Sequence, residues 1–319
     1  MRIHEKDKQD ADLEVALECF RNSWDYDELF HYNSSTPIYH YTSPKGFFNI
    51  LQAGNVNLWF SRYDSLNDVM EGKNIFKIYQ AVCDQLRESQ LINEEFYQAI
   101  YDLQIPGKEF FSYYDESSNT SEIKAQEYER YLCCFSKNRD SLPMWNYYSK
   151  EGKYEGYNIG FSFFDMHLHS THVNDHILKL YTVVYDDREK ANQIKKKILF
   201  YYSLFKNFKN QITTIRNFLS TFLKSLSLIF KESCFSHEEE VRAILTVSTN
   251  QNRFEVKHRQ KNGYDIPYIE YSLPITAVKS ITIGPLLDEK RTREEVASML
   301  VDRDYNVTDI RASQIPIRY

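Results

Sequence analysis

Residues 236–245 read Ser-His-Glu-Glu-Glu-Val-Arg-Ala-Ile-Leu, and this stretch decides how the chain is interpreted. Side chains alternate between the two faces of a β-strand, so a strand here would place Glu238, Glu240 and Arg242 on one face. The intervening residues would point into an apolar core: Val241, Ala243 and Leu245. Two carboxylates and a guanidinium leading into a buried strand form a candidate catalytic group. A structural ion pair between Glu240 and Arg242 on an edge strand explains the same residue types equally well.

Further strand patterns lie on both sides of this stretch. We expect strands at residues 38–41, 56–60, 131–136, 156–163, 178–185, 240–248, 266–272, 278–284 and 305–311. Pro44 opens a helix that we expect to end near Gly54, and residues 73–103 have a helical pattern. Because the strands and helices lack a regular β-α-β rhythm, the sequence predicts the α+β class. Residues 1–37 are expected to be a helical lead-in to a single α+β domain over residues 38–319.

The strongest periodicity runs from residue 194 to residue 229. Apolar residues recur there at spacings of four and three, without Gly or Pro: Ile194, Ile198, Tyr201, Phe205, Phe208, Ile212, Ile215, Leu219, Phe222, Leu226 and Ile229. One helix of this length would span about 54 Å, and a bent helix or a helical hairpin fits equally well. We therefore expect a helical insertion over about residues 188–232, which could also mediate oligomerisation or hold a helical partner.

The helical insertion is basic. Residues 188–231 hold 10 Lys and Arg against one acid, Glu189, whereas the whole chain has a net charge of −6. Basic residues interleaved with aromatic residues can contact a phosphate backbone. A solvated face of the helix, or pairing with the acidic remainder of the chain, explains the same charges.

The composition limits how a nucleotide could be bound and where the protein resides. The chain has 319 residues but only 9 Gly, and it contains neither G-x-G-x-x-G nor G-x-x-x-x-G-K-[ST]. Five scattered Cys without a C-x-x-C pair predict reduced thiols. With no signal peptide and no apolar run of membrane-spanning length, we expect a cytoplasmic protein.

Four histidines form a second cluster of possible chemistry. His167, His169, His172 and His176 have the spacing H-x-H-x2-H-x3-H, which could supply zinc ligands. The cluster has no Cys or H-E-x-x-H companion, so we interpret it as a polar surface loop and expect no metal. A serine nucleophile of the G-x-S-x-G type is absent from the sequence.

An ordered set of short segments covers most of residues 38–319. The segments are Tyr39-His40-Tyr41-Thr42-Ser43, Ile50-Leu51, Leu58 with Ser61, Leu66-Asn67-Asp68 with Glu71, Cys134-Phe135-Ser136, Met144-Trp145 with Tyr148, Gly156 with Ile159-Gly160-Phe161, Glu238-x-Glu240-x-Arg242, Ile283-Gly284-Pro285 and Ser313-x-Ile315-Pro316-x-Arg318. Together they resemble a bacterial domain-of-unknown-function family, number 2971. That family usually has Trp shortly before the first Glu, where this chain has Phe235.

The opening of the set, a His in the first strand followed by a helix ending near a Gly, is similar to ADP-ribosyltransferases, particularly those that target nucleic acids. This similarity implies two small, mostly antiparallel sheets with flanking helices, and NAD in a cleft between the sheets. By the same similarity, His40 would bind the ribose and Glu238 or Glu240 would be catalytic. Trp145 or Tyr148 would stack on the nicotinamide. The other implied NAD contacts are Tyr41, Thr42, Ser61 and Arg242.

Physical chemistry is compatible with this implied site. Cleavage of the nicotinamide–ribose bond develops positive charge on the sugar, which a carboxylate stabilises more in the transition state than in the ground state. We expect an ADP-ribosyltransferase-like enzyme that uses NAD as substrate and modifies a nucleic acid or a protein, for example a toxin or a phage-defence effector. Two alternatives remain open: a non-enzymatic nucleic-acid- or protein-binding module with a degenerate cleft, and a nuclease or other hydrolase that uses Glu238, Glu240 and a histidine.

Overall fold

The computed structural model describes residue 32 and residues 35–65, 74–103, 109–114, 123–149, 154–166, 176–249, 254–261 and 263–317. The expected helical lead-in, up to residue 31, lies outside these ranges. By its contacts the chain divides into two compact units. One unit takes residues 1–31, 67–109 and 183–233, and the other takes residues 32–66, 110–182 and 234–319.

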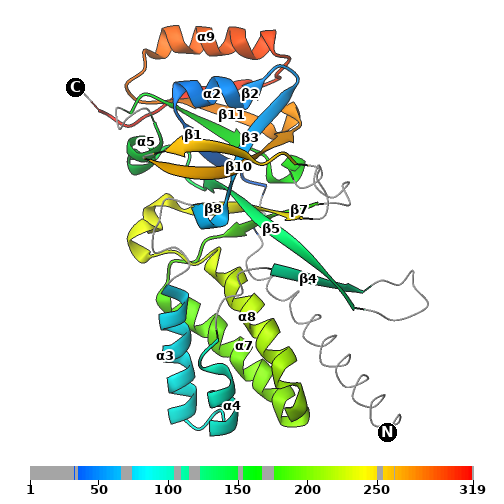
Figure 1. The fold of residues 1–319 in the computed structure, drawn as a ribbon. Coiled ribbons are helices and arrows are strands. Elements are labelled where there is room, and N and C mark those ends of the chain that lie inside the picture. The colour runs from blue at the N-terminus through cyan, green and yellow to red at the C-terminus, as the bar shows by residue number, and fades with distance from the viewer. Residues whose placement is uncertain are drawn as a thin grey trace. The chain divides into compact units, whose positions relative to one another are not determined.

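The first unit is helical in its described part (Figure 1). Its helices are α3 (Asn74–Glu88), α4 (Glu94–Ile100), α7 (Asp187–Asn207) and α8 (Ile212–Ser227). The apolar stripe of residues 194–229 is divided between α7 and α8, which a short 3₁₀ turn, Lys209–Gln211, connects. Because α7 and α8 contact each other, the stripe forms a helical hairpin. Most of its apolar residues are buried, among them Ile194, Ile198, Phe205, Ile215 and Leu219, whereas Phe208, Ile212 and Phe222 are half-buried.

Residues 67–109 contribute the partners of this hairpin, which the sequence did not indicate. The ring centroids of Phe96 on α4 and Phe205 on α7 lie 5.0 Å apart. The hydroxyl of Tyr79 on α3 donates a hydrogen bond of 2.8 Å to the carbonyl oxygen of Ile100. The segment expected as an insertion within one domain thus shares a compact unit with residues far away in the sequence.

The second unit is built on a sheet, which with its helices gives the α+β class. In the described part of the chain the strands are β1 (Ile38–Thr42), β2 (Leu51–Gln52), β3 (Asn55–Arg62), β4 (Glu109–Tyr114), β5 (Ile123–Ser136), β6 (Tyr157–Phe161), β7 (His176–Thr182), β8 (Glu240–Ser248), β9 (Lys257–Lys261), β10 (Tyr264–Leu273), β11 (Val278–Ile283) and β12 (Asp309–Ala312). Among the helices of this unit are α2 (Pro44–Ile50), α5 (Leu142–Tyr148) and α9 (Glu289–Asp302).

The sheet divides at β5. One edge of β5 pairs with β8, from Tyr128 opposite Ser248 to Ser136 opposite Glu240. Over residues 131–136 the other edge is shared by two strands: β3 pairs with Tyr131 and Leu132, and β1 pairs with Ser136, while β4 also pairs with β5. Two branches follow in the strand order, β1-β6-β11-β12 and β3-β10-β9. The pairs just named are antiparallel, except for β11 with β12.

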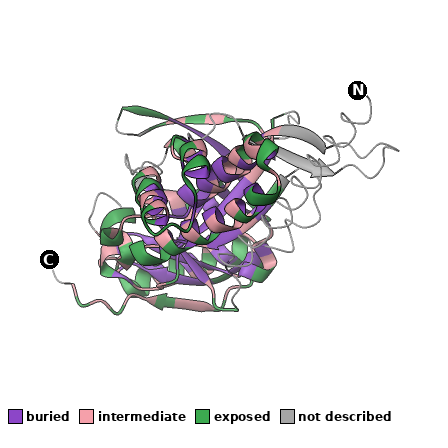
Figure 2. Ribbon diagram, turned by 90° about the horizontal axis from the view of Figure 1, so that it is seen from below, coloured by how far each residue is buried: buried purple, intermediate pink, exposed green. Residues whose placement is uncertain are grey.

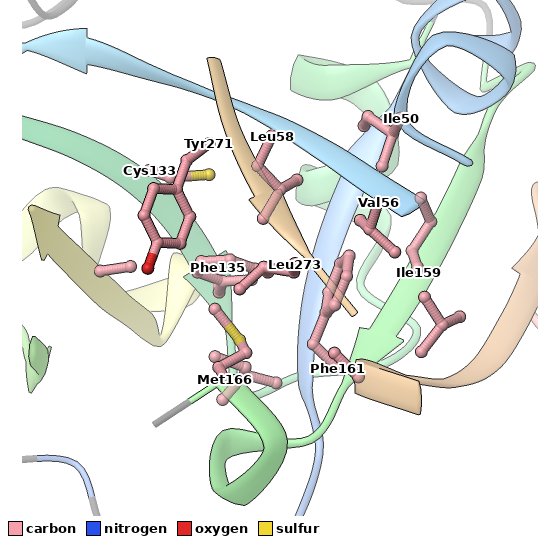
Figure 3. Close-up of a cluster of buried hydrophobic side chains, with 14 of the residues drawn as sticks. Ile50, Val56, Leu58, Cys133, Phe135, Ile159, Phe161, Met166, Tyr271 and Leu273 are labelled. Carbon is pink, nitrogen blue, oxygen red and sulfur yellow. The ribbon is translucent and has the colours of Figure 1, made fainter. Parts of the chain in front are cut away.

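The main hydrophobic core joins side chains from both branches (Figure 3). Phe161 and Ile159 of β6 belong to the same cluster as Leu58 of β3, Leu273 of β10 and Phe135 of β5. Helix α9 adds Val296 and Leu300, and α2 adds Phe47 and Ile50. Figure 2 shows buried residues in both the strands and the helices. Strands β1, β3, β5, β6, β8, β10 and β11 each contribute residues to this core from one face, so the other face of each is directed away from it.

The prediction that the helix opened by Pro44 ends near Gly54 is wrong. Helix α2 ends at Ile50, and Gly54 lies in the turn of the β2–β3 hairpin with φ of 76°. This left-handed conformation suits glycine because it has no Cβ. Gly54 therefore fixes the hairpin turn and does not cap the helix.

Gly284, directly after β11, is required by a close approach of two backbones. Its amide donates a hydrogen bond of 2.9 Å to the carbonyl oxygen of Gly156. A Cβ at Gly284 would lie 2.8 Å from that oxygen and 2.7 Å from the carbonyl oxygen of Tyr154. Neither backbone atom can rotate out of the way as a flexible side chain can.

We expect Gly284→Ala to lower the free energy of unfolding by about 1–3 kcal/mol, because the two backbone segments must separate. Urea denaturation followed by circular dichroism measures this change. A midpoint equal to that of the unmodified protein would show that the backbones separate without cost.

Candidate functional site

The outer face of the sheet carries the polar residues of the candidate site. The register aligns Tyr39 of β1, Ser136 of β5 and Glu240 of β8 in one row across the three strands. Directly paired residues share a face of a sheet. The adjacent residues in all three strands belong to the main core: Ile38, Phe135 and Val241. Glu240, and with it Arg242, therefore lies on the outer face.

His40 lies on the inner face. Its partner on β6 is Ile159, and its ring centroid is 5.6 Å from that of Phe135. Both neighbours belong to the main core. His40 and Glu240 thus point to opposite faces of the sheet. The structure does not bring them together in one cleft, contrary to the arrangement that the resemblance implies.

The His40 side chain is bonded at the point where the two branches diverge. Its Nδ1 lies 3.0 Å from the carbonyl oxygen of Cys134, a residue between the part of β5 that pairs with β3 and the part that pairs with β1. A carbonyl oxygen only accepts, so Nδ1 carries the proton and donates. Buried backbone carbonyls need a partner, and His40 supplies one where the neighbouring strands leave a gap. Burial lowers the pKa of His40, partly opposed by this hydrogen bond, so the ring is held neutral.

Glu240 and Arg242 form a buried ion pair. Nε of Arg242 lies 2.9 Å from Oε1 of Glu240, and Nη2 lies 3.2 Å from Oε2. The side chain of Glu240 is only 4% exposed and that of Arg242 only 1%. Both carboxylate oxygens of Glu240 therefore contact the guanidinium. Of the two interpretations of this segment, the geometry favours the ion pair, although the pair is buried in the sheet and β8 is not an edge strand.

Cys134 lies opposite Arg242 on the outer face. Burial, followed by the negative charge of Glu240, holds the pKa of the Cys134 thiol well above its usual value. A thiol is nucleophilic as the thiolate, so this cysteine is poorly suited to nucleophilic chemistry.

Glu238 is positioned by a turn, and the strand alternation expected for it is wrong. Strand β8 begins at Glu240, whereas Glu238 is the last residue of a 3₁₀ turn, Ser233–Glu238. Between them Glu239 takes a left-handed conformation with φ of 45°, which is uncommon for a residue with a Cβ. Glu238 is 5% exposed, and its backbone carbonyl accepts a hydrogen bond of 2.6 Å from Oγ of Ser136.

Helix α5 places Tyr148 beside Glu238. The Tyr148 hydroxyl lies 3.4 Å from Oε1 of Glu238, and the residue is 36% exposed. Trp145 is instead fully buried, with its Nε1 donating to Oδ1 of Asp140 at 2.7 Å. The resemblance implies that one of these two rings stacks on the nicotinamide. Tyr148 is accessible to a ligand, and Trp145 is not.

The other residues implied for NAD binding lie elsewhere or have structural contacts. The Tyr41 hydroxyl donates to the carbonyl oxygen of Asn138 and accepts from the amide of Ser141, each at 2.9 Å. Thr42 ends β1 opposite Tyr157. Ser61 belongs to the branch of β3, where its Oγ accepts a hydrogen bond of 2.9 Å from Arg259. The sequence did not single out Arg259.

Asp140 organises the surroundings of Trp145, and the sequence analysis missed it. Its carboxylate accepts from Nε1 of Trp145 and Oγ of Ser313 at 2.7 Å, and from the amide of Gln314 at 2.8 Å. The available signal was its position shortly before Pro143, in the turn that opens α5, where Asp is a frequent residue. Asp140 connects α5 to the C-terminal segment and so keeps the helix against the outer face.

Three of the four clustered histidines, His167, His169 and His172, lie outside the described residues. For His176 only the backbone, at the start of β7, is described. Within the described ranges, no group of three His, Cys, Asp or Glu side chains is arranged to hold a metal ion. No helix in the described part of the chain is long and apolar enough to cross a membrane.

Comparison with known proteins identifies one relationship. Residues 144–243 match the family model described as Protein of unknown function (DUF2971), which confirms the resemblance to domain-of-unknown-function family 2971. The matched segment includes Tyr148, Glu238, Glu240 and Arg242, whereas His40 lies outside it. No curated protein and no solved structure matches the chain.

The first prediction for this region concerns the pH dependence of stability. The folded pKa of His40 lies below the unfolded value of about 6.5, so between the two values the unfolded state binds more protons. The free energy of unfolding should therefore fall as the pH drops below about 6.5, by at most about 1.4 kcal/mol per pH unit from this residue. His40→Asn, which keeps a nitrogen donor but does not titrate, should show a smaller fall in urea titrations between about pH 7 and pH 5. Equal pH dependence in both proteins would contradict this role.

The second prediction concerns the ion pair. We expect Glu240→Ala to lower the free energy of unfolding by about 3–5 kcal/mol, because it leaves Arg242 buried without its carboxylate. Glu239→Ala removes an exposed carboxylate one residue away and should change stability by about 0.5 kcal/mol or less. The double variant Glu240→Met/Arg242→Leu should recover much of the loss. A mild effect of Glu240→Ala in urea denaturation would argue against a structural pair.

Proposed function

We propose that this protein is an ADP-ribosyltransferase-like enzyme that cleaves NAD at the nicotinamide–ribose bond and transfers ADP-ribose to a macromolecule. The observation that carries the proposal is the pairing of a buried carboxylate, Glu238, with an accessible aromatic ring, Tyr148, at 3.4 Å. Both residues lie within residues 144–243, the segment that matches the family model.

Glu238 is the better candidate for the catalytic carboxylate. Both oxygens of Glu240 contact Arg242, so its negative charge is already balanced. Glu238 is buried but lies next to a ring that a ligand can reach. A carboxylate in a poorly hydrated position acts strongly on a developing positive charge, because little water screens it.

The chemistry assigns one role to each of these residues. Tyr148 would stack on the nicotinamide, and Glu238 would face the ribose. As the bond between nicotinamide N1 and ribose C1′ breaks, its electron pair leaves with nicotinamide. Glu238 would stabilise the positive charge on the sugar until a nucleophile of the acceptor bonds to C1′ and loses its proton.

His40 has no place in this mechanism. Its ring is on the inner face of the sheet and its Nδ1 proton is used by the Cys134 carbonyl. We assign it to the junction of the branches. In this mechanism the ribose is contacted from the outer face of the sheet, near α5, and not by His40.

The proposal is tested by incubating the protein with NAD, with and without added nucleic acid, and measuring the released nicotinamide by chromatography. Glu238→Gln should reduce turnover by about 10²–10³-fold, the usual loss for one electrostatic contact to the transition state. Glu239→Gln, which alters the exposed neighbour, should leave turnover within about twofold, and Tyr148→Ala should raise KM more than it lowers kcat.

The control outcomes separate this activity from the alternatives. If folded protein neither binds nor consumes NAD in either condition, the proposal is wrong and a binding module is the better description. Metal-dependent cleavage of RNA or DNA that requires Glu238 would instead identify a hydrolase.

A further inference from the structure

The outer face of the β3-β10-β9 branch carries a group of side chains that the proposed reaction does not use. On β3, Leu58 and Phe60 belong to the core, so Trp59 and Ser61 point outward. The register extends this outward row to β10 and β9, where Tyr268 pairs with both Ser61 and Lys257. We call Trp59, Tyr268 and Arg259 the Trp59 platform.

The two rings of the platform pack against each other at a tilt. The centroids of Trp59 and Tyr268 lie 4.5 Å apart with 30° between the ring planes. Tyr268 is buried, whereas Trp59 remains 38% exposed. An exposed tryptophan that is held in place by a neighbouring ring offers a flat apolar surface at little further cost in conformational entropy. Such a surface fits another planar ring.

Arg259 adds a positive charge next to these rings. Its guanidinium carbon lies 5.7 Å from the centre of the Trp59 ring and 5.9 Å from that of Tyr268. Nη2 donates to Oγ of Ser61 at 2.9 Å, whereas Nε is buried and has no hydrogen-bond partner in the described part of the chain. Burial lowers the pKa of Arg259.

The neighbouring cations Lys257 and Arg62 each have a carboxylate partner, whereas Arg259 has none among the described residues. Nζ of Lys257 lies 2.9 Å from Oε2 of Glu270, and Nε of Arg62 lies 2.8 Å from Oδ1 of Asp64. Among the described residues, no carboxylate forms an ion pair with Arg259. A guanidinium of this kind, held beside two rings, is suited to a phosphate group.

We propose that the Trp59 platform binds single-stranded nucleic acid, with a base stacked on Trp59 and a backbone phosphate at Arg259. Aromatic side chains on an open sheet face, together with arginine, bind single strands because every base presents a π-face and every linkage a phosphate. In a duplex the bases are already stacked inside the helix, so Trp59 would have no ring to bind. This binding does not require NAD cleavage and goes beyond the proposed function.

Binding of the full chain to fluorescein-labelled oligonucleotides of about 12 nucleotides, without NAD, tests the platform. Fluorescence anisotropy should show single-stranded RNA or DNA bound more tightly than a duplex of the same length. Trp59→Ala should weaken binding by about fivefold or more, the loss expected for one stacked base, and Trp59→Phe should retain most of the affinity. Arg259→Gln should weaken binding and reduce the slope of log K against log salt by about one.

Matched controls alter the same residue types elsewhere in the unit. Phe164 is 63% exposed and Arg291 of α9 is 80% exposed in its side chain, so Phe164→Ala and Arg291→Gln should bind as the unmodified protein does. Thermal unfolding of each variant establishes that it is folded. The proposal is overturned if no single strand binds at about 50 mM salt, if duplex binds equally well, or if Trp59→Ala and Trp59→Leu, both folded, keep full affinity.

Discussion

The structure depends on how the hydrogen-bonding capacity of β5 is used. Every strand has two edges, and the backbone groups along both need partners when they are buried. On β5, strand β8 occupies one edge from residue 128 to residue 136, while β3 and β1 share the other. Since β3 and β1 diverge, the carbonyl of Cys134 between them is bonded by a side chain, His40. The two branches and the core that they enclose follow from this divided edge.

The outer face of the sheet carries two separate groups of side chains. On β8 lies the buried pair of Glu240 and Arg242, with Glu238 and Tyr148 near the start of the strand. On the β3-β10-β9 branch lie Trp59, which is exposed, and Arg259, which forms no ion pair with a carboxylate among the described residues. A buried ion pair adds little net stability, but removing one of its partners lowers the stability strongly. Both residues lie on β8, two positions apart, so this strand supplies the partner for each of its own buried charges.

Local sequence patterns predicted the elements but not their arrangement. Alternation placed Val241, Ala243 and Leu245 in the core and Glu240 and Arg242 opposite them, as the structure has them. It failed at Glu238 because Glu239 is left-handed, and the sequence gives no sign of that conformation. The relation of His40 to Glu240 depends on pairing between strands distant in the chain, as in the 94-residue separation of His40 and Cys134. The same limit applies to residues 67–109, whose packing with the helical hairpin depends on long-range contacts.

The helical hairpin has a consequence for the order of folding. Strands β7 and β8 pair with each other, yet β7 ends at Thr182 and β8 begins at Glu240. The intervening segment is closed near its base: the amide of Val184 donates to the carbonyl of Ile229 at 2.8 Å, and the amide of Lys231 donates to the carbonyl of Val184 at 3.2 Å. Helices form from local contacts within about a microsecond, whereas closing a long loop costs entropy that grows with its length. By forming early, α7 and α8 shorten the effective loop between β7 and β8, so that two distant strands can pair almost as the arms of a simple β-hairpin do.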